Sequence, residues 1–194
     1  MAEPLFFFGA MSPYSWFAAE RIGVLMPDAR WRPVFAGALF KASERVSWGL
    51  TERRGEGMAD CEARAAAHGL GPIRWPDPWP TNDLLIARAL THADARGTLQ
   101  PLALSAMRLT FLEGIDLGEL DAVLEAGRRA GLGEPELQDA LADPSVKQAL
   151  RESTDGAHAL GVFGVPTVAV GERLFWGDDR LQDAVEARRA LAGA

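Results

Sequence analysis

The chain has 194 residues, of which 48% are hydrophobic and 24% charged, a balance typical of a globular protein made of one domain, or of one domain carrying an insertion. The formal net charge of −7 argues against a nucleic-acid partner, because binding to phosphates requires a basic face. No apolar run is long enough to cross a membrane and the N-terminus lacks the features of a signal peptide, so we expect a cytoplasmic protein without a membrane partner.

The N-terminal part of the chain predicts a strand, a helix and a second strand. Leu5–Phe8 is a continuous apolar run, typical of a strand that is buried on both faces of a sheet. Ser12 followed by Pro13 predicts the N-cap and the first residue of a helix. A short strand is expected over residues 31–35, and Pro33 within it indicates the edge of the sheet, because proline cannot donate a hydrogen bond to a neighbouring strand.

In the middle of the chain, helix signals dominate and strand signals nearly vanish. Residues 41–71 predict a mobile loop followed by a short helix. Residues 72–80 are rich in proline and tryptophan and predict a stiff loop, because proline fixes φ and removes a backbone donor. Helices with apolar stripes follow, and we expect glycines to end them at Gly97, Gly114 and Gly131.

The strand pattern returns near the C-terminus. Residues 167–170 and 173–176 predict two strands joined by a tight turn at Gly171-Glu172. Asp178 or Asp179 is expected to cap a final helix.

The order of these elements predicts an α/β fold interrupted by helices. We predict that residues 1–39 and 157–194 together form the α/β domain and that residues 40–156 form an all-helical insertion domain. The connection between the first two strands is expected to be a right-handed crossover, as in nearly all such units.

Cysteine and histidine are too sparse to build a redox or metal centre. Cys61 is the single cysteine, which excludes an internal disulfide, and its helix-like surroundings predict a bystander thiol. The histidines His68, His92 and His158 stand apart without a second ligand at metal-binding spacing, so we predict no metal site.

The start of the first predicted helix carries the most informative motif, Ser12-Pro13-Tyr14-Ser15. A helix that follows a strand directly presents its backbone N–H groups, and the positive end of its dipole, at the N-cap residue. Thioredoxin-type proteins place a Cys-x-x-Cys pair at this point. Here the hydroxyls of Ser12 and Ser15 stand in place of both thiols. We infer that a reactive sulfur is supplied by a bound ligand.

Three motifs together resemble one known family. They are Ser-Pro-Tyr-Ser-Trp at 12–16, Gly-Val-Phe-Gly-Val-Pro-Thr at 161–167 and Phe-Trp-Gly-Asp-Asp-Arg at 175–180. They resemble the 2-hydroxychromene-2-carboxylate isomerase family, which is close to the kappa-class glutathione transferases and belongs to the DsbA-like group. The motifs fall at both ends of the chain, while the middle matches in its helical character alone. The resemblance implies a thioredoxin-like fold interrupted by an all-helical insertion domain, and a homodimer.

The resemblance also implies how a thiol is held. The expected cofactor is glutathione or another low-molecular-weight thiol, with Ser12 donating to its thiolate and Val165 pairing with its cysteinyl unit before a cis Pro166. A charge-assisted bond of about 1.5–3 kcal/mol lowers a thiol pKa by one to two units, from about 8.5 to near physiological pH. Asp179, with Asp178 beside it, is expected to meet the γ-glutamyl end.

Each of these assignments has a purely structural alternative. Ser12 can serve as a helix cap alone, and Pro166 can be a simple proline at the start of a strand. Asp178 and Asp179 can satisfy the N-terminus of the last helix, a role compatible with ligand binding.

The implied reaction is the isomerisation of a small aromatic substrate, 2-hydroxychromene-2-carboxylate, by reversible thiolate addition to a conjugated double bond. The residues expected to wall the substrate are Tyr14, Trp16, Trp75 and Trp79, and the alternative for each is a place in the core. The alternative activities are a kappa-like glutathione transferase or peroxidase, and a non-enzymatic thiol-binding module. Disulfide exchange is disfavoured because it needs two sulfurs.

The sequence departs from the family pattern in two places. Members commonly carry Asp after the first strand, in a Phe-x-Phe-Asp-Phe pattern, and Gly9-Ala10-Met11 replaces that segment here. Several members carry a Gly-Asn pair and a Lys that hold the glycyl carboxylate. The candidates of suitable charge in this chain are Lys41, Arg53 and Arg54.

Overall fold

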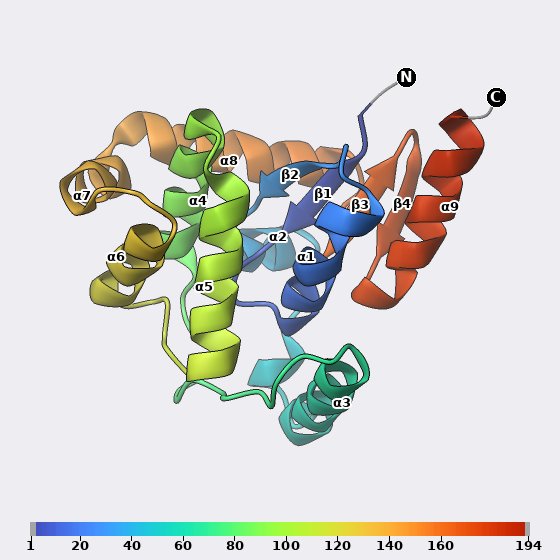
Figure 1. Cartoon of the computed structure of the whole chain (residues 1–194), viewed down its shortest axis with the longest axis horizontal. Helices are drawn as coiled ribbons and strands as arrows, with labels where there is room; N and C mark the ends of the chain where they lie inside the picture. Colours follow the sequence, from blue (N-terminus) through green and yellow to red (C-terminus); the bar gives the residue numbers. More distant parts are fainter. Residues whose placement is uncertain (1–2, 193–194) are drawn as a thin grey trace.

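The computed structural model describes residues 3–192 and contains one mixed four-stranded sheet in the order β2-β1-β3-β4 (Figure 1). The strands are β1 (Leu5–Phe8), β2 (Arg30–Pro33), β3 (Thr167–Val170) and β4 (Arg173–Trp176). β1 runs parallel to β2 and antiparallel to β3, and β3 and β4 form an antiparallel hairpin. The sequence-predicted strand–helix–strand unit and the C-terminal hairpin are therefore both present.

The position of each strand explains its sequence. β1 lies between two neighbours and is covered on both faces, so a continuous apolar run suits it. β2 is an edge strand and ends at Pro33, as expected. It spans Arg30–Pro33, whereas the sequence predicts residues 31–35. The strand ends before Phe35 because this residue is the N-cap of the next helix.

Helices cover both faces of the sheet, and the alternation along β1 separates two hydrophobic clusters. Phe6 and Phe8 point into the larger cluster with α1 (Pro13–Leu25) and α9 (Leu181–Ala192). Phe7 points into the smaller cluster with residues of α2 (Ala36–Ala42) and α8 (Pro144–Ala159). The sheet is thus the middle layer of three.

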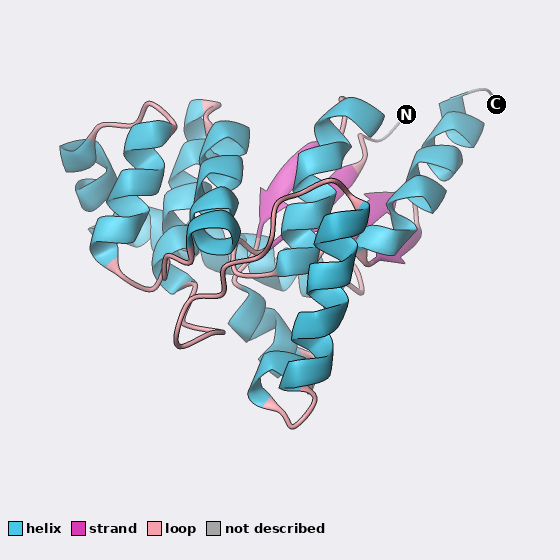
Figure 2. Cartoon of the chain, turned by 60° about the horizontal axis from the view of Figure 1, so that its bottom comes forward, coloured by secondary structure: helices cyan, strands magenta, loops and turns pink. Residues whose placement is uncertain are grey.

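The remaining helices lie mainly to one side of the sheet, where α4, α5, α6 and α7 form one cluster (Figures 1 and 2). Their bounds are α4 Leu84–Arg96, α5 Leu99–Glu113, α6 Leu120–Arg129 and α7 Glu134–Ala142. α4 ends at Gly97 with φ 72° and α5 at Gly114 with φ 76°, which confirms both predicted stops. α8 begins after Asp143, whose carboxylate accepts from Ser145 N at 2.7 Å.

The cluster of helices shares its core with the sheet layer. The indole of Trp16 on α1 stacks on Phe111 of α5, with ring centroids 5.4 Å apart. The proposed domain limits after residues 39 and 156 fall inside α2 and α8, and the division into two domains stays a prediction.

The segment predicted as a mobile loop with a short helix is more ordered than its sequence suggests. Residues 41–71 contain the end of α2, a 3-10 turn η1 (Trp48–Leu50) and the 14-residue helix α3 (Arg54–Ala67). A tertiary contact accounts for this, since Gly57 packs so closely on Trp48 that a Cβ would overlap the indole ring. The loop at 72–80 is irregular, as predicted.

α6 begins at Leu120, and Leu117 lies fully buried in the turn before it. Among residues 3–192, no helix combines the length and the hydropathy needed to cross a membrane.

Candidate functional site

A cavity of about 610 Å³ opens where β1 ends and α1 begins. Its lining comes from segments far apart in the chain, including Ser12, Tyr14, Lys41, Trp79, Asp83 and Val165. This volume is in the range of small-molecule sites. The predicted helix-start motif and the predicted Val-Pro motif therefore face one common space.

Ser12 is the N-cap of α1, which confirms the prediction from its sequence. Its φ of −97° is non-helical, and its Oγ accepts a hydrogen bond from Ser15 N at 3.2 Å. A hydroxyl that accepts one bond still carries its own proton, so Ser12 O–H can donate into the cavity. Ser15 is fully buried and points away, its Oγ accepting from Gly9 N at 3.4 Å.

Val165 lines the same cavity as this helix start. Its peptide bond to Pro166 is cis, as the resemblance implied. Val165 is 5% exposed and its side chain packs near Gly9, with Cγ2 3.6 Å from the place of a Cβ on that glycine. Pro166 O accepts from Gly177 N at 2.9 Å and so holds the end of β4 in place. Pairing of Val165 with a cysteinyl unit stays a prediction.

Tyr14 forms part of the cavity wall and its hydroxyl is tied to α3. It donates to Asp60 Oδ2 at 3.2 Å, and the Arg64 guanidinium lies 5.3 Å from its ring centroid. Burial, together with Cys61 and Asp60, raises the pKa of Tyr14, so the phenol stays protonated. Burial also raises the pKa of Cys61 to about 12, which makes this fully buried thiol unreactive, as expected.

The four predicted aromatic wall residues separate into two groups. Tyr14 and Trp79 line the cavity, as does Trp48, whose ring centroid lies 5.1 Å from that of Trp79. Trp75 packs behind Trp79 at 4.7 Å and donates to Glu62 Oε1 at 3.0 Å, outside the lining.

Trp16 does not belong to the cavity wall. It is fully buried, donates to Glu20 Oε1 at 3.0 Å and stacks in the core instead. The prediction that Trp16 contacts a substrate is corrected, because its position on α1 faces the helical cluster.

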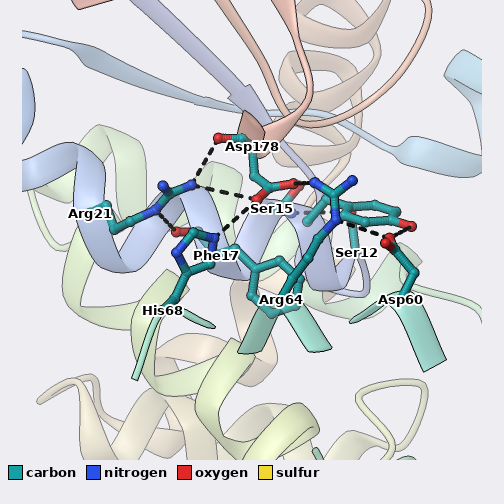
Figure 3. A network of polar contacts seen from close by, with 9 residues as sticks. Ser12, Ser15, Phe17, Arg21, Asp60, Arg64, His68 and Asp178 are labelled. Carbon is teal, nitrogen blue, oxygen red and sulfur yellow. Dashed lines mark hydrogen bonds and ion pairs between the residues drawn. The ribbon is translucent and has the colours of Figure 1, made fainter. Parts of the chain in front are cut away.

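Asp178 lies in a network of charged groups rather than in the cavity (Figure 3). Its Oδ1 accepts from Arg64 Nη1 at 2.9 Å, and its Oδ2 lies 3.5 Å from Arg21 Nη2 and 3.3 Å from His68 Nε2. The carboxylate is 2% exposed, and its own carbonyl oxygen accepts from Arg21 Nη2 at 2.8 Å. Asp178 thus joins α1, α3 and η2 (Asp178–Arg180), and its contact with a cofactor stays a prediction.

Asp179 is exposed at the start of η2 and outside the cavity lining, so its contact with a ligand stays a prediction. Neither acid caps a helix, since Gly177 is the N-cap of η2 without a side-chain bond and η2 runs directly into α9.

Of the basic residues considered for an anionic group, Lys41 lines the cavity. Arg53 pairs with Glu56 on the surface, and Arg54 donates to the carbonyl oxygen of Trp79 at 3.2 Å. Arg45, which was not predicted, also lines the cavity and lies over the rings of Phe163 and Trp176, at 5.0 and 4.9 Å. The cavity therefore carries two cationic side chains.

Asp83 is a second lining residue, besides Arg45, that the sequence did not reveal. It is 6% exposed, and the backbone N–H of Ala36 favours the charged form of its carboxyl. Burial raises its pKa from 3.8 to about 7. In sequence an acid just before an apolar helix indicates a cap, and Asp83 does stand at the N-cap of α4, but without a capping bond from its side chain.

We expect Asp83 to make the free energy of unfolding fall as pH rises from about 4 to about 7. The folded-state pKa lies above the ordinary value, so the folded state binds more protons in this window, and the stability that they contribute is lost as pH rises through the folded pKa. The slope is at most about 1.4 kcal/mol per pH unit. Asp83→Asn should flatten it in thermal denaturation measured across this window, and an unchanged slope would contradict the assignment.

Comparison with known proteins identifies the family. A family model described as a DSBA-like thioredoxin domain matches residues 5–188, nearly the whole chain. The chain belongs to the DsbA-like thioredoxin family. It is 26% identical to glutathione S-transferase kappa 1 of Homo sapiens, over 91% of this chain and 86% of the relative. It is also 26% identical to 2-hydroxychromene-2-carboxylate isomerase of Sphingobium xenophagum, over 91% and 92%.

A solved structure of 2-hydroxychromene-2-carboxylate isomerase superposes on this DsbA-like chain with a TM-score of 0.85 at 21% identity, covering 97% and 95% of the two chains. The comparisons confirm the family resemblance and the thioredoxin-like α/β fold with inserted helices.

This DsbA-like protein lacks the pair of reactive thiols that disulfide exchange needs. Ser12 and Ser15 occupy the N-cap and the third helical position of α1, and the single thiol of Cys61 is buried and protonated. Residues 3–192 hold no group of three or more His, Cys, Asp or Glu side chains that could bind a metal ion. The cavity instead offers a hydroxyl donor, two cations, an aromatic wall and one buried carboxyl, which suit binding an anion and moving a proton.

Proposed function

We propose that this DsbA-like protein is a glutathione-dependent cis–trans isomerase of the 2-hydroxychromene-2-carboxylate type that acts in the breakdown of aromatic compounds. The observation that carries the proposal is the meeting of the Ser12 hydroxyl and the cis Val165-Pro166 bond in one cavity of a protein without a reactive thiol of its own. The relatives named as isomerase and as glutathione transferase support it.

The residues present fit a bound thiolate. Ser12 can donate its O–H to a sulfur anion, and the positive end of the α1 dipole lies beside it. When bound, glutathione would supply a thiolate that adds reversibly to a conjugated double bond, so that the bond rotates as a single bond before the thiolate leaves. Lys41 and Arg45 can hold carboxylate groups of the ligands.

The aromatic side chains of the cavity are suited to binding the substrate. Trp48 and Trp79 provide a flat apolar wall for a small aromatic compound. Glutathione is a thiol of reducing compartments, so the proposal places the protein in the cytoplasm. A homodimer, as implied by the resemblance, is part of the proposal.

Calorimetric titration with reduced glutathione tests the proposal. We expect the wild type to bind, Ser12→Ala to retain most of the affinity, and Asp179→Ala to lose it, because an exposed acid on η2 is the expected partner of the ligand's ammonium group. Asp155→Ala, an exposed acid on α8, is the matched control and should bind like the wild type. Failure of glutathione to bind the wild type would refute the proposal.

A kappa-like glutathione transferase is the second candidate, and the 26% identity to glutathione S-transferase kappa 1 favours it specifically. The two activities differ in the fate of the thiol. An isomerase returns glutathione unchanged, whereas a transferase consumes it in proportion to product. Measuring free thiol during turnover of an electrophilic aromatic substrate separates them.

A further inference from the structure

Asp83 is a buried titratable group for which the proposed reaction, as described above, has no role. It lies at the start of α4 and lines the cavity, and its exposed fraction is 6%. The groups that act on its ionisation are its buried surroundings and the backbone N–H groups of Ala36 and of Asp83 itself. Because no charged side chain is among them, the carboxyl can be charged or neutral near neutral pH.

Asp83 lies close to the proposed thiol site. Its Oδ2 is 3.6 Å from the place where a Cβ would stand on Gly9, and Val165 Cγ2 is 3.6 Å from the same point. Gly9 O accepts from Ser12 N at 3.2 Å, so a single turn joins this glycine to the Ser12 cap. Both Asp83 and Ser12 face the same cavity.

The glycine makes this approach possible. A Cβ at position 9 would come within 3.1 Å of Ala36 Cβ, tighter than most contacts, so a larger residue would push α2 and its N–H away from Asp83.

Besides Asp83, three titratable or cationic side chains among the described residues line the cavity. They are Tyr14 of α1, Lys41 of α2 and Arg45 of the following loop, and Arg88 lies on α4 itself. Tyr14 stays protonated because its pKa is raised, and lysine and arginine carry their protons at neutral pH. Asp83 is therefore the lining side chain, among the residues described, that is suited to taking up a proton near neutral pH.

We propose that Asp83 is the proton acceptor of this cavity, taking the proton that a bound thiol loses when it is held as a thiolate beside Ser12. The inference rests on the proposed thiol-dependent function. The S–H bond breaks, its electron pair stays on sulfur, and the proton forms an O–H bond on the Asp83 carboxylate. The reverse transfer restores the thiol before it leaves, so no oxidant or other co-reactant is needed.

The test counts the protons released when reduced glutathione binds, by calorimetry at about pH 7.5 in buffers of different ionisation enthalpy. In the wild type we expect clearly less than one proton to be released for each thiolate formed, because the negative charge of the nearby thiolate favours the protonated form of Asp83, which then keeps part of the proton. In Asp83→Asn we expect release of about one proton for each thiolate formed. The ultraviolet absorbance of the thiolate shows in both proteins that the anion is present.

Two controls sharpen the result. S-methylglutathione has no thiol proton and should give the same proton count in both proteins. Asp155→Asn, on the exposed face of α8, should behave like the wild type.

Carbon-13 NMR of the wild-type carboxyl needs no variant and should show Asp83 becoming protonated as glutathione is added. Equal proton release from the wild type and Asp83→Asn, or a carboxyl resonance that does not respond, would overturn this inference and leave the proposed function standing. Absence of glutathione binding would overturn both.

Discussion

We expect Ser12→Ala to lower the rate of the thiol-dependent reaction by about 10- to 100-fold. The Ser12 hydroxyl faces the cavity from the N-cap of α1, and a hydrogen bond to a charged acceptor contributes about 1.5–3 kcal/mol. Removing it raises the pKa of the bound thiol and lowers the fraction of thiolate. Steady-state kinetics with saturating glutathione, measured as a function of pH, should show the acidic limb of the profile move to higher pH.

Ser12 also accepts from Ser15 N, so its loss weakens the helix start by about 0.5–2 kcal/mol. Ser12→Thr separates the two roles, because threonine keeps both the cap and the O–H donor and should retain most activity. Thermal denaturation of both variants shows how much of any effect is structural. An Ser12→Ala protein that turns over like the wild type, with an unshifted pH profile, would mean that Ser12 is a cap alone.

We expect Asp178→Ala to lower the free energy of unfolding by about 3 kcal/mol, the lower end of the range for breaking a buried ion pair. The carboxylate is 2% exposed and faces Arg21 and Arg64, which are 29% and 32% exposed and so keep part of their hydration. In a chain of this size such a loss lowers the melting temperature by about 6–12 °C. Chemical denaturation and thermal scans check the value.

Asp183→Ala is the matched control, because Asp183 pairs with Arg180 on the exposed surface of α9 and such pairs contribute less than about 1 kcal/mol. If Asp178 bound glutathione instead of bracing α1 against α3, its replacement would abolish binding and leave the melting temperature nearly unchanged. That pattern would contradict the structural role given to it by Arg21, Arg64 and His68 (Figure 3).

The parts of the fold that could be predicted are those with short-range causes. Ser12 and Pro13 mark the start of α1, Gly97 and Gly114 end their helices in left-handed conformations, and Pro33 lies on an edge strand. Each of these outcomes depends on groups within a few residues of one another, such as an N–H that needs an acceptor or a φ that only glycine adopts freely.

The errors arise where distant segments meet. The helix α3 was underestimated because its sequence is weakly apolar, and its packing on Trp48 comes from another element. Trp16 was placed in the substrate wall, since sequence alone does not say which side of α1 meets α5. The ion pair of Asp178 with Arg64 could not be predicted, because the two residues lie 114 positions apart along the chain.

The amino-acid sequence alone determined the order of strands and helices, the replacement of two thiols by hydroxyls at the start of α1, and the Val165-Pro166 motif opposite it, because backbone geometry and capping act locally. The tertiary structure decided which side chains share the cavity. In the tertiary structure Asp83 is buried beside Gly9, Asp178 pairs with two arginines, and Trp16 packs in the core. The physical reason is that burial and charge pairing depend on the packing of α2, α3 and α4 around β1, and those contacts join residues far apart in the chain.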